Sequence, residues 1–203
     1  MKFFVDSSDP KEIRTCVEQG LIEGASVSVS SGGRDVEALV AEVCDLIKGP
    51  VSVEVAGEDK DGLVRGARAL AKIAPNVVVR VPLTAEGLKA VRICTQEKIP
   101  THVTLCTSPV QALLAAKAGA RWISPSPSPG RADETAADGI ELVRKTVAIY
   151  KTYGFDAQVL VASIRGANHI VEAALVGAQA ASVPFAVLQA LVRHPASDAG
   201  LGT

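Results

Sequence analysis

Three ionisable side chains interrupt short apolar runs that are otherwise built from valine, phenylalanine and small residues. They are Asp6 in KFFVD, Glu54 in VSVEVA and Arg80 in VVVRVPL. A carboxylate can serve as a general acid or base, and a guanidinium can hold a carboxylate or phosphate through two parallel hydrogen bonds. Because a buried charge is costly unless it is paired, charges inside such runs indicate either a mutually neutralising network or a functional site.

Side-chain alternation places these charges on the same side of their strands as several hydroxyl groups. In the run 51–56 the three valines take alternate positions and leave Ser52 and Glu54 on the opposite side, and the run 77–83 leaves Val78 and Arg80 there. The same alternation assigns further polar residues to this side, namely Asp6, Ser26, Ser28, Thr104, Ser126 and Ser163.

The elements that must position these residues recur at regular intervals. Eight short runs rich in β-branched residues alternate with segments of helical periodicity. The runs cover 2–6, 25–30, 51–56, 77–83, 101–106, 121–126, 158–164 and 181–185. Asp9 before Pro10 and Ser108 before Pro109 predict helix starts, and glycine at position 119 is typical of a helix end.

Eight alternations with short connections predict an α/β fold, a (β/α)8 TIM barrel forming a single domain over residues 1–203. In such a barrel the polar side chains described above line the interior and its C-terminal mouth, where enzymes of this architecture keep their chemistry. A doubly wound open sheet is the alternative. It normally has fewer strands, and the glycine-rich dinucleotide fingerprint of its first turn is absent from this sequence.

Composition excludes several classes of partner. The chain has 203 residues, of which 48% are hydrophobic, and its formal net charge is -1, so nothing indicates a nucleic-acid or membrane partner. The four cysteines are scattered without a C-x-x-C pair, and the first residues reach an acidic side chain at once. We therefore expect a cytoplasmic protein without a signal peptide. Whether it forms a homo-oligomer stays open.

Histidine placement gives no support for a metal site or another cofactor. His102, His169 and His194 lack the spacing of metal ligands, and only His102 faces the interior by strand alternation. The simplest interpretation is a packed histidine inside the barrel and two histidines on helix surfaces.

At the same residues the chain resembles the small transaldolases and fructose-6-phosphate aldolases. The matching segments run from end to end and include FFVDSSD, VVVRVPLTAEGLKAV, IPTHVTLCTSPVQALLAAKAGARWISP, GRAD, VLVASIRG and VPFAVLQALVRHPASDAGL. The resemblance implies a class I aldolase barrel that acts on sugar phosphates.

The resemblance also gives roles to five residues. Asp6 matches the family's strand-one aspartate, Glu54 the strand-three group that helps to position the catalytic water, and Thr104 the strand-five hydroxyl. Ser163 matches the serine near the phosphate. Arg131 in GRAD matches the phosphate-binding arginine, although extra residues in SPSPSPG shift its loop.

Three other positions depart from the family pattern. Arg80 stands where the family has its Schiff-base lysine, Ser28 where it has an asparagine, and Ser126 where it usually has an aromatic residue. Imine formation needs a neutral amine, which a buried lysine can supply and a guanidinium cannot. Other lysines fall in predicted helices or connecting loops, or at the N-terminal end of a strand, among them Lys2, Lys48, Lys60, Lys72, Lys89, Lys98, Lys117, Lys145 and Lys151.

Three functions remain open on this evidence. The first is a protein that binds a phosphorylated sugar or related anion, through Arg131, Ser163 and Arg165, but has lost Schiff-base turnover. The second is a lyase, isomerase or dehydratase in which Glu54 or Asp6 is the base and the strand-four arginine stabilises an enolate or carboxylate. The third is a noncatalytic regulatory or assembly partner with an inert mouth.

Overall fold

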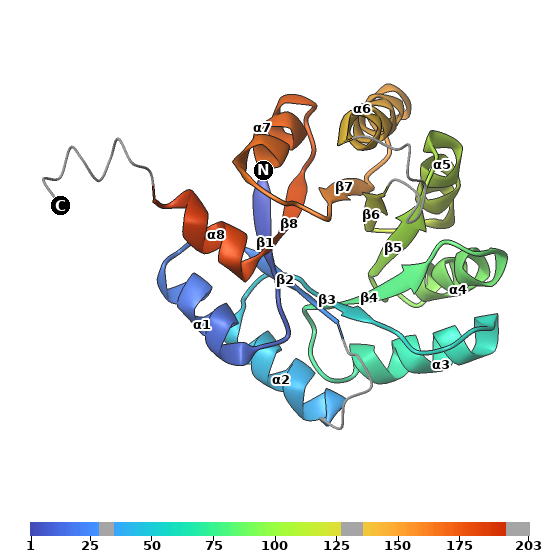
Figure 1. The fold of residues 1–203 in the computed structure, drawn as a ribbon. Helices are drawn as coiled ribbons and strands as arrows, with labels where there is room; N and C mark the ends of the chain where they lie inside the picture. Colours follow the sequence, from blue (N-terminus) through green and yellow to red (C-terminus); the bar gives the residue numbers. More distant parts are fainter. Residues whose placement is uncertain (29–34, 127–135, 194–203) are drawn as a thin grey trace, which may run out of the picture.

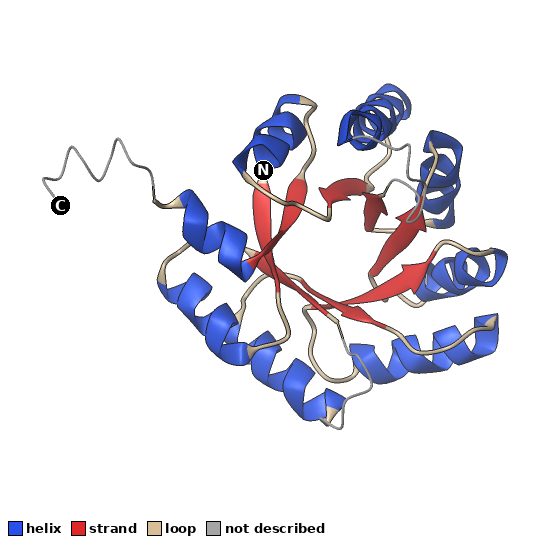
Figure 2. Ribbon diagram, viewed as in Figure 1, coloured by secondary structure: helices blue, strands red, loops and turns tan. Residues whose placement is uncertain are grey.

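In the part of the chain that the structure describes, eight parallel strands close into a barrel, and eight helices form a ring around it (Figures 1 and 2). The predicted (β/α)8 architecture is confirmed in the computed structural model, which describes residues 1–28, 35–126 and 136–193. Each strand pairs with the next in chain order, and β1 (Lys2–Asp6) closes the barrel against β8 (Ala180–Pro184).

The remaining strands are β2 (Gly24–Val27), β3 (Val51–Glu54), β4 (Val77–Pro82), β5 (Thr101–Cys106), β6 (Trp122–Pro125) and β7 (Gln158–Val161). The helices are α1 (Pro10–Glu18), α2 (Val36–Leu46), α3 (Lys60–Ala71), α4 (Ala85–Gln96), α5 (Pro109–Ala118), α6 (Ala136–Tyr153), α7 (Ala167–Leu175) and α8 (Phe185–Leu191). No helix within these described ranges is long and apolar enough to cross a membrane.

Two separate apolar clusters confirm the alternation expected from the sequence. The odd-numbered valines of β3 and β4 belong to the layer between barrel and helices. A smaller cluster fills the barrel interior and consists of Phe4, Val78, Trp122, Leu160 and Ala180. The Phe4 and Trp122 rings meet edge to face with centroids 5.3 Å apart, so this part of the barrel interior is a packed core.

Helix ends follow the predicted capping residues. The Asp9 side chain accepts from the Lys11 amide at the start of α1, and the Ser108 side chain accepts from the Gln111 amide at the start of α5. Gly119 ends α5 with a φ of 99°, a left-handed conformation in which glycine has no Cβ penalty. These caps fix the residues at which α1 and α5 begin and at which α5 ends.

Several strands are shorter than the apolar runs that predict them and end earlier in the sequence. The predicted strand over 158–164 is wrong beyond Val161, because Ser163 has a φ of 59°, which is not a strand conformation. β2 ends at Val27, and residues 29–30 of its predicted run lie outside the described residues. Alternation therefore does not place Ser163 on the barrel interior. Ser163 is instead exposed in the loop after β7.

β5 carries an irregularity at the barrel rim. Its register with β6 shifts between Val103 and Cys106, and Leu105 adopts a φ of 57° while remaining 55% exposed. A left-handed leucine costs roughly 1–2 kcal/mol, and bulges concentrate at barrel rims and beside active sites. The bulge therefore lies at the C-terminal end of the barrel, the same end as the polar residues singled out in the sequence.

Candidate functional site

A buried chain of hydrogen bonds crosses the barrel above the interior apolar cluster. Ser52 Oγ lies 2.8 Å from His102 Nδ1, His102 Nε2 lies 2.8 Å from Ser124 Oγ, and Ser124 Oγ donates to Leu160 O at 2.7 Å. Because Ser124 donates its single hydroxyl proton to the Leu160 carbonyl oxygen, its Oγ must accept from His102 Nε2–H. Ser52 then donates to Nδ1, which fixes the histidine as the neutral Nε2–H tautomer.

The surroundings of His102 also keep it neutral. Burial lowers the pKa of His102 to about 3, with a smaller contribution from the positive charge of Arg80. The interpretation of His102 as a packed interior histidine is therefore supported by its geometry. A second buried hydroxyl pair completes this layer, in which Ser182 Oγ donates to Ser26 Oγ at 2.9 Å.

Arg80 lies above this layer and turns toward the ends of β2 and β3. Its Nη2 donates to Val27 O at 2.8 Å and to Ser52 O at 3.2 Å, and its Nη1 reaches Ser28 Oγ at 3.5 Å. Its Nε is buried without a hydrogen-bond partner among the described residues. Burial lowers the pKa of Arg80, and the negative charge of Glu54 opposes that shift, so the guanidinium remains a charged donor fixed by backbone carbonyls.

Asp6 and Glu54 lie near this guanidinium without forming an ion pair with it in the described part of the chain. Glu54 ends β3 and is the register partner of Arg80. Desolvation at the mouth raises the pKa of Asp6, and the positive charge of Arg80 lowers it by less. The three charges therefore interact through space, and the network of direct contacts expected if they only neutralised one another is not formed.

The raised pKa of Asp6 predicts that this carboxylate destabilises the folded protein at neutral pH. The folded state holds the Asp6 proton more tightly than the unfolded chain, so stability is lost as pH rises through the folded pKa. Asp6→Asn should therefore raise the thermal midpoint at pH 7, with an advantage that shrinks as pH falls toward 4. Scanning calorimetry at both pH values tests this, and a less stable Asp6→Asn protein at pH 7 would contradict it.

The hydroxyl candidates occupy the same end of the barrel. Thr104 is half-buried opposite Pro82, and Ser126 follows β6 with its amide bonded to Cys106 O at 2.9 Å. The exposed Ser28 lies at the end of β2, where its amide donates to Ser8 Oγ at 3.1 Å.

The residues expected to bind phosphate are only partly described. Ser163 and Arg165 follow β7 and are both exposed, and the Arg165 amide donates to His169 Nδ1 at 3.3 Å. Arg131 lies outside the described residues, as does His194. Among the described residues no group of three histidine, cysteine or acidic side chains could hold a metal ion.

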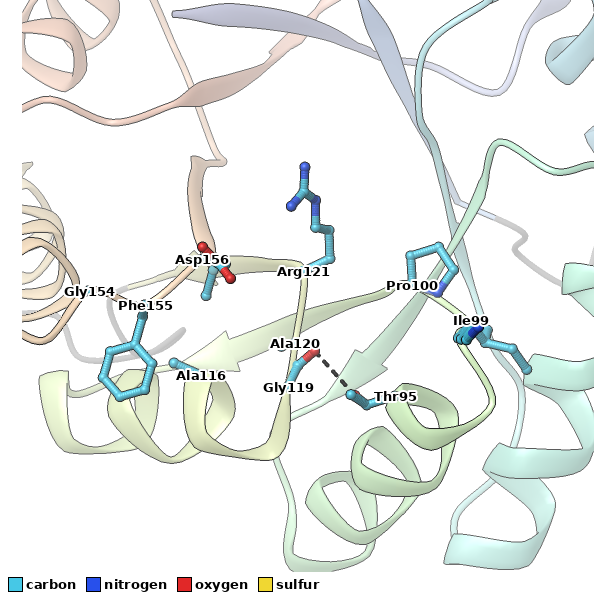
Figure 3. A pocket seen from close by; sticks show the side chains of 12 residues that line it. Thr95, Ile99, Pro100, Ala116, Gly119, Ala120, Arg121, Gly154, Phe155 and Asp156 are labelled. Atoms are coloured by element: carbon cyan, nitrogen blue, oxygen red, sulfur yellow. Dashed lines mark hydrogen bonds between the residues drawn. The ribbon is translucent and has the colours of Figure 1, made fainter.

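A hollow of about 480 Å³ lies at the other end of the barrel (Figure 3). It is formed where α4, α5 and α6 lead into the following strands, and Thr95 Oγ1 donates to Gly119 O at 3.2 Å along its edge. Among its charged lining residues are Arg121 and Asp156, but no member of the predicted site lines it. The polar constellation at the C-terminal mouth, and not this hollow, is therefore the candidate site.

Comparison with known proteins identifies the ancestry of this mouth. Residues 36–201 match the family model described as Transaldolase/Fructose-6-phosphate aldolase. The chain belongs to the transaldolase/fructose-6-phosphate aldolase family. A "Probable transaldolase" of Sorangium cellulosum is 48% identical over 99% of this chain and 94% of its own length. Another from Sinorhizobium medicae is 46% identical over 100% of this chain and 94% of its own length.

Solved structures with low sequence identity support the barrel alone. A mandelate oxidase variant superimposes with a TM-score of 0.65 at 19% identity over 93% of this chain and 66% of that chain. A flavocytochrome b2 variant gives a TM-score of 0.68 at 15% identity over 94% of this chain and 58% of that chain. This transaldolase-family chain thus spans less than two thirds of those longer chains, and the likeness concerns the fold.

Two residues of the buried polar layer were not among the residues singled out in the sequence. Ser124 and Ser182 occupy interior positions of β6 and β8, adjacent to the Ser52–His102 pair and to Ser26 respectively. The alternation that identified Ser52 also applies to these strands, so their positions could have been found. Their hydrogen-bond partners depend on the closed barrel.

Proposed function

We propose that this transaldolase-family protein binds a phosphorylated sugar at the C-terminal mouth of the barrel without forming a Schiff base with it. The family supports a sugar-phosphate ligand of carbohydrate metabolism. The observation that carries the proposal is the guanidinium of Arg80, held by two strand carbonyls at the position that the family resemblance gives to the imine-forming lysine.

The distribution of lysines supports the absence of imine chemistry. The only lysine within the described strands is Lys2, the first residue of β1, at the end of the barrel opposite the mouth. The described loops that follow the strands at the mouth hold none. Lys11 and Lys60 lie in the first turns of α1 and α3 at that end, and Lys60 Nζ lies 3.1 Å from the Asp61 carboxylate. Both lysines therefore belong to the ring of helices and not to the barrel interior, where an imine-forming amine would have to stand.

The loop after β7 supports the proposed phosphate end. Arg165 is exposed and forms no ion pair within the described ranges, so its guanidinium is available to an anion. Ser163 lies two residues before it in a left-handed conformation, which is uncommon for a residue other than glycine and concentrates at ligand sites.

Arg165→Ala should weaken binding of fructose 6-phosphate by roughly 10- to 100-fold, the usual worth of one or two charge-assisted hydrogen bonds. Titration calorimetry measures the dissociation constant, with fructose as the ligand that lacks a phosphate. Arg92→Ala is the matched control, since Arg92 is exposed on α4. Equal affinity in the Arg165→Ala and Arg92→Ala proteins would remove Arg165 from the site.

A second candidate function is acid–base chemistry at the same mouth. The raised pKa of Asp6 favours it, because a carboxyl group that holds its proton more tightly is a better general acid near neutral pH. Arg80 would then stabilise an enolate or carboxylate. Conversion of a bound sugar phosphate in wild type but not in the Asp6→Asn protein would favour this function over binding alone.

A further inference from the structure

A second hollow opens at the N-terminal end of the barrel, opposite the proposed sugar-phosphate site. It has a volume of about 290 Å³, and Val78 and Trp122 of the interior apolar cluster contribute to its lining. Three cationic residues also line it: Lys2 at the start of β1, Lys48 before β3 and Arg121 before β6. No acidic residue is among the described residues that line it.

None of these cations has an acidic partner among the residues that the structure describes. Across residues 1–28, 35–126 and 136–193, none of the three takes part in an ion pair. The Glu23 carboxylate near the start of β1 accepts from the Phe3 amide at 2.8 Å. Figure 3 shows the Arg121 side chain extending away from Thr95 and Ala120. Three cationic side chains around one concave site, without an ion pair among the described residues, favour an anion there.

The backbone that carries the cations is held firmly. The Asn76 side-chain nitrogen Nδ2 donates to Ile47 O at 2.8 Å and to Gly49 O at 3.0 Å, on either side of Lys48. A Cβ at Gly49 would lie 1.8 Å from Glu23 O, so this close approach requires glycine. Arg121 is anchored by its amide, which donates to Thr101 O at 2.9 Å. Fixed anchors reduce the conformational entropy that a ligand would have to remove.

We infer that this N-terminal hollow binds a small multivalent phosphate anion. The Arg121 guanidinium can hold one phosphate group through paired hydrogen bonds, while the Lys2 and Lys48 ammonium groups act as point charges toward a second. The formal net charge of the chain is -1, so the attraction comes from these three residues and not from the protein as a whole. The site is separate from the proposed sugar-phosphate site and does not depend on it.

Inorganic pyrophosphate is the probe, and tryptophan fluorescence is the readout, because Trp122 is the single tryptophan of the chain and lines the hollow. Wild type should bind pyrophosphate saturably, with affinity that falls as NaCl rises. Lys48→Gln or Arg121→Gln alone should weaken binding about tenfold, and the triple variant that adds Lys2→Gln should weaken it about 100-fold or more. Titration calorimetry repeats each measurement independently of fluorescence.

Two control variants separate this site from others. Lys151→Gln removes an exposed α6 lysine and Arg92→Ala an exposed α4 arginine, so both should bind pyrophosphate like wild type. Arg165→Ala is measured beside them, because it removes pyrophosphate binding at the opposite mouth and leaves the N-terminal hollow unchanged. The single Lys48→Gln protein changes only an exposed side chain in a connection and keeps the test valid if the triple variant fails to fold. The inference is overturned if wild type shows no saturable binding, if Lys48→Gln and Arg121→Gln bind like wild type, or if only Arg165→Ala loses binding.

Discussion

Arg80→Lys should restore at most trace retro-aldol turnover of fructose 6-phosphate. The new ammonium would stand near Asp6 and Glu54, whose negative charges stabilise its protonated form and oppose the lowered pKa that imine formation needs. The substitution would also remove the planar guanidinium group that donates to Val27 O and Ser52 O. Misplacement of a reacting group by about 1 Å can cost ~100-fold in rate.

Two further substitutions sharpen this test. Adding Ser28→Asn and Ser126→Phe to Arg80→Lys supplies the side-chain types that the family resemblance places around the carbonyl and the imine, so turnover should rise above that of the single variant. A coupled assay for glyceraldehyde 3-phosphate release measures both proteins. Robust activity from Arg80→Lys alone would show that a single residue separates this mouth from an active aldolase, contrary to our account.

Acid should destabilise the protein through His102. Its folded pKa of about 3 lies below that of an unfolded histidine, so the unfolded chain binds the extra proton first as pH falls. Stability that is fully present above the unfolded pKa of about 6.5 is therefore lost on the way down toward the folded value. A single group of this kind contributes up to ~1.4 kcal/mol per pH unit, or about 2–3 kcal/mol between pH 6 and pH 4.

His102→Gln provides the comparison, because glutamine is polar and stays neutral throughout this range. Its free energy of unfolding should fall less steeply from pH 6 to pH 4 than that of wild type, whatever the cost of the substitution at pH 7. Urea unfolding at each pH gives both slopes. The raised pKa of Asp6 acts with the opposite sign and is common to both proteins. Equal slopes would mean that His102 does not resist protonation in the folded state.

Local chemistry was enough to predict the barrel and most of its interior. The alternation of Val77, Val79 and Val81 placed Val78 and Arg80 inside, and both valine sets occur in the expected apolar clusters. Asp9 and Ser108 cap the helices they were expected to cap. These features depend on strand parity and on contacts within a few residues, which a sequence contains directly.

Contacts that depend on the closed barrel could not be predicted in the same way. The Arg80 guanidinium was expected near Asp6 and Glu54, yet its hydrogen bonds go to carbonyls of β2 and β3. The rotamer of a long side chain depends on its three-dimensional surroundings, which the sequence does not contain directly. The left-handed backbone at Ser163 ended β7 early, and alternation has no meaning beyond that point.

Borohydride reduction followed by intact-mass measurement distinguishes sugar-phosphate binding without an imine from class I aldolase chemistry. Wild type is incubated with fructose 6-phosphate or dihydroxyacetone at a concentration that saturates the binding measured by calorimetry, then reduced, and its mass is compared with that of untreated protein. Because Arg80 cannot supply the neutral amine of an imine, the mass should be unchanged although the sugar phosphate is bound. A stoichiometric increase equal to a reduced ligand adduct, mapped to any lysine, would contradict the account.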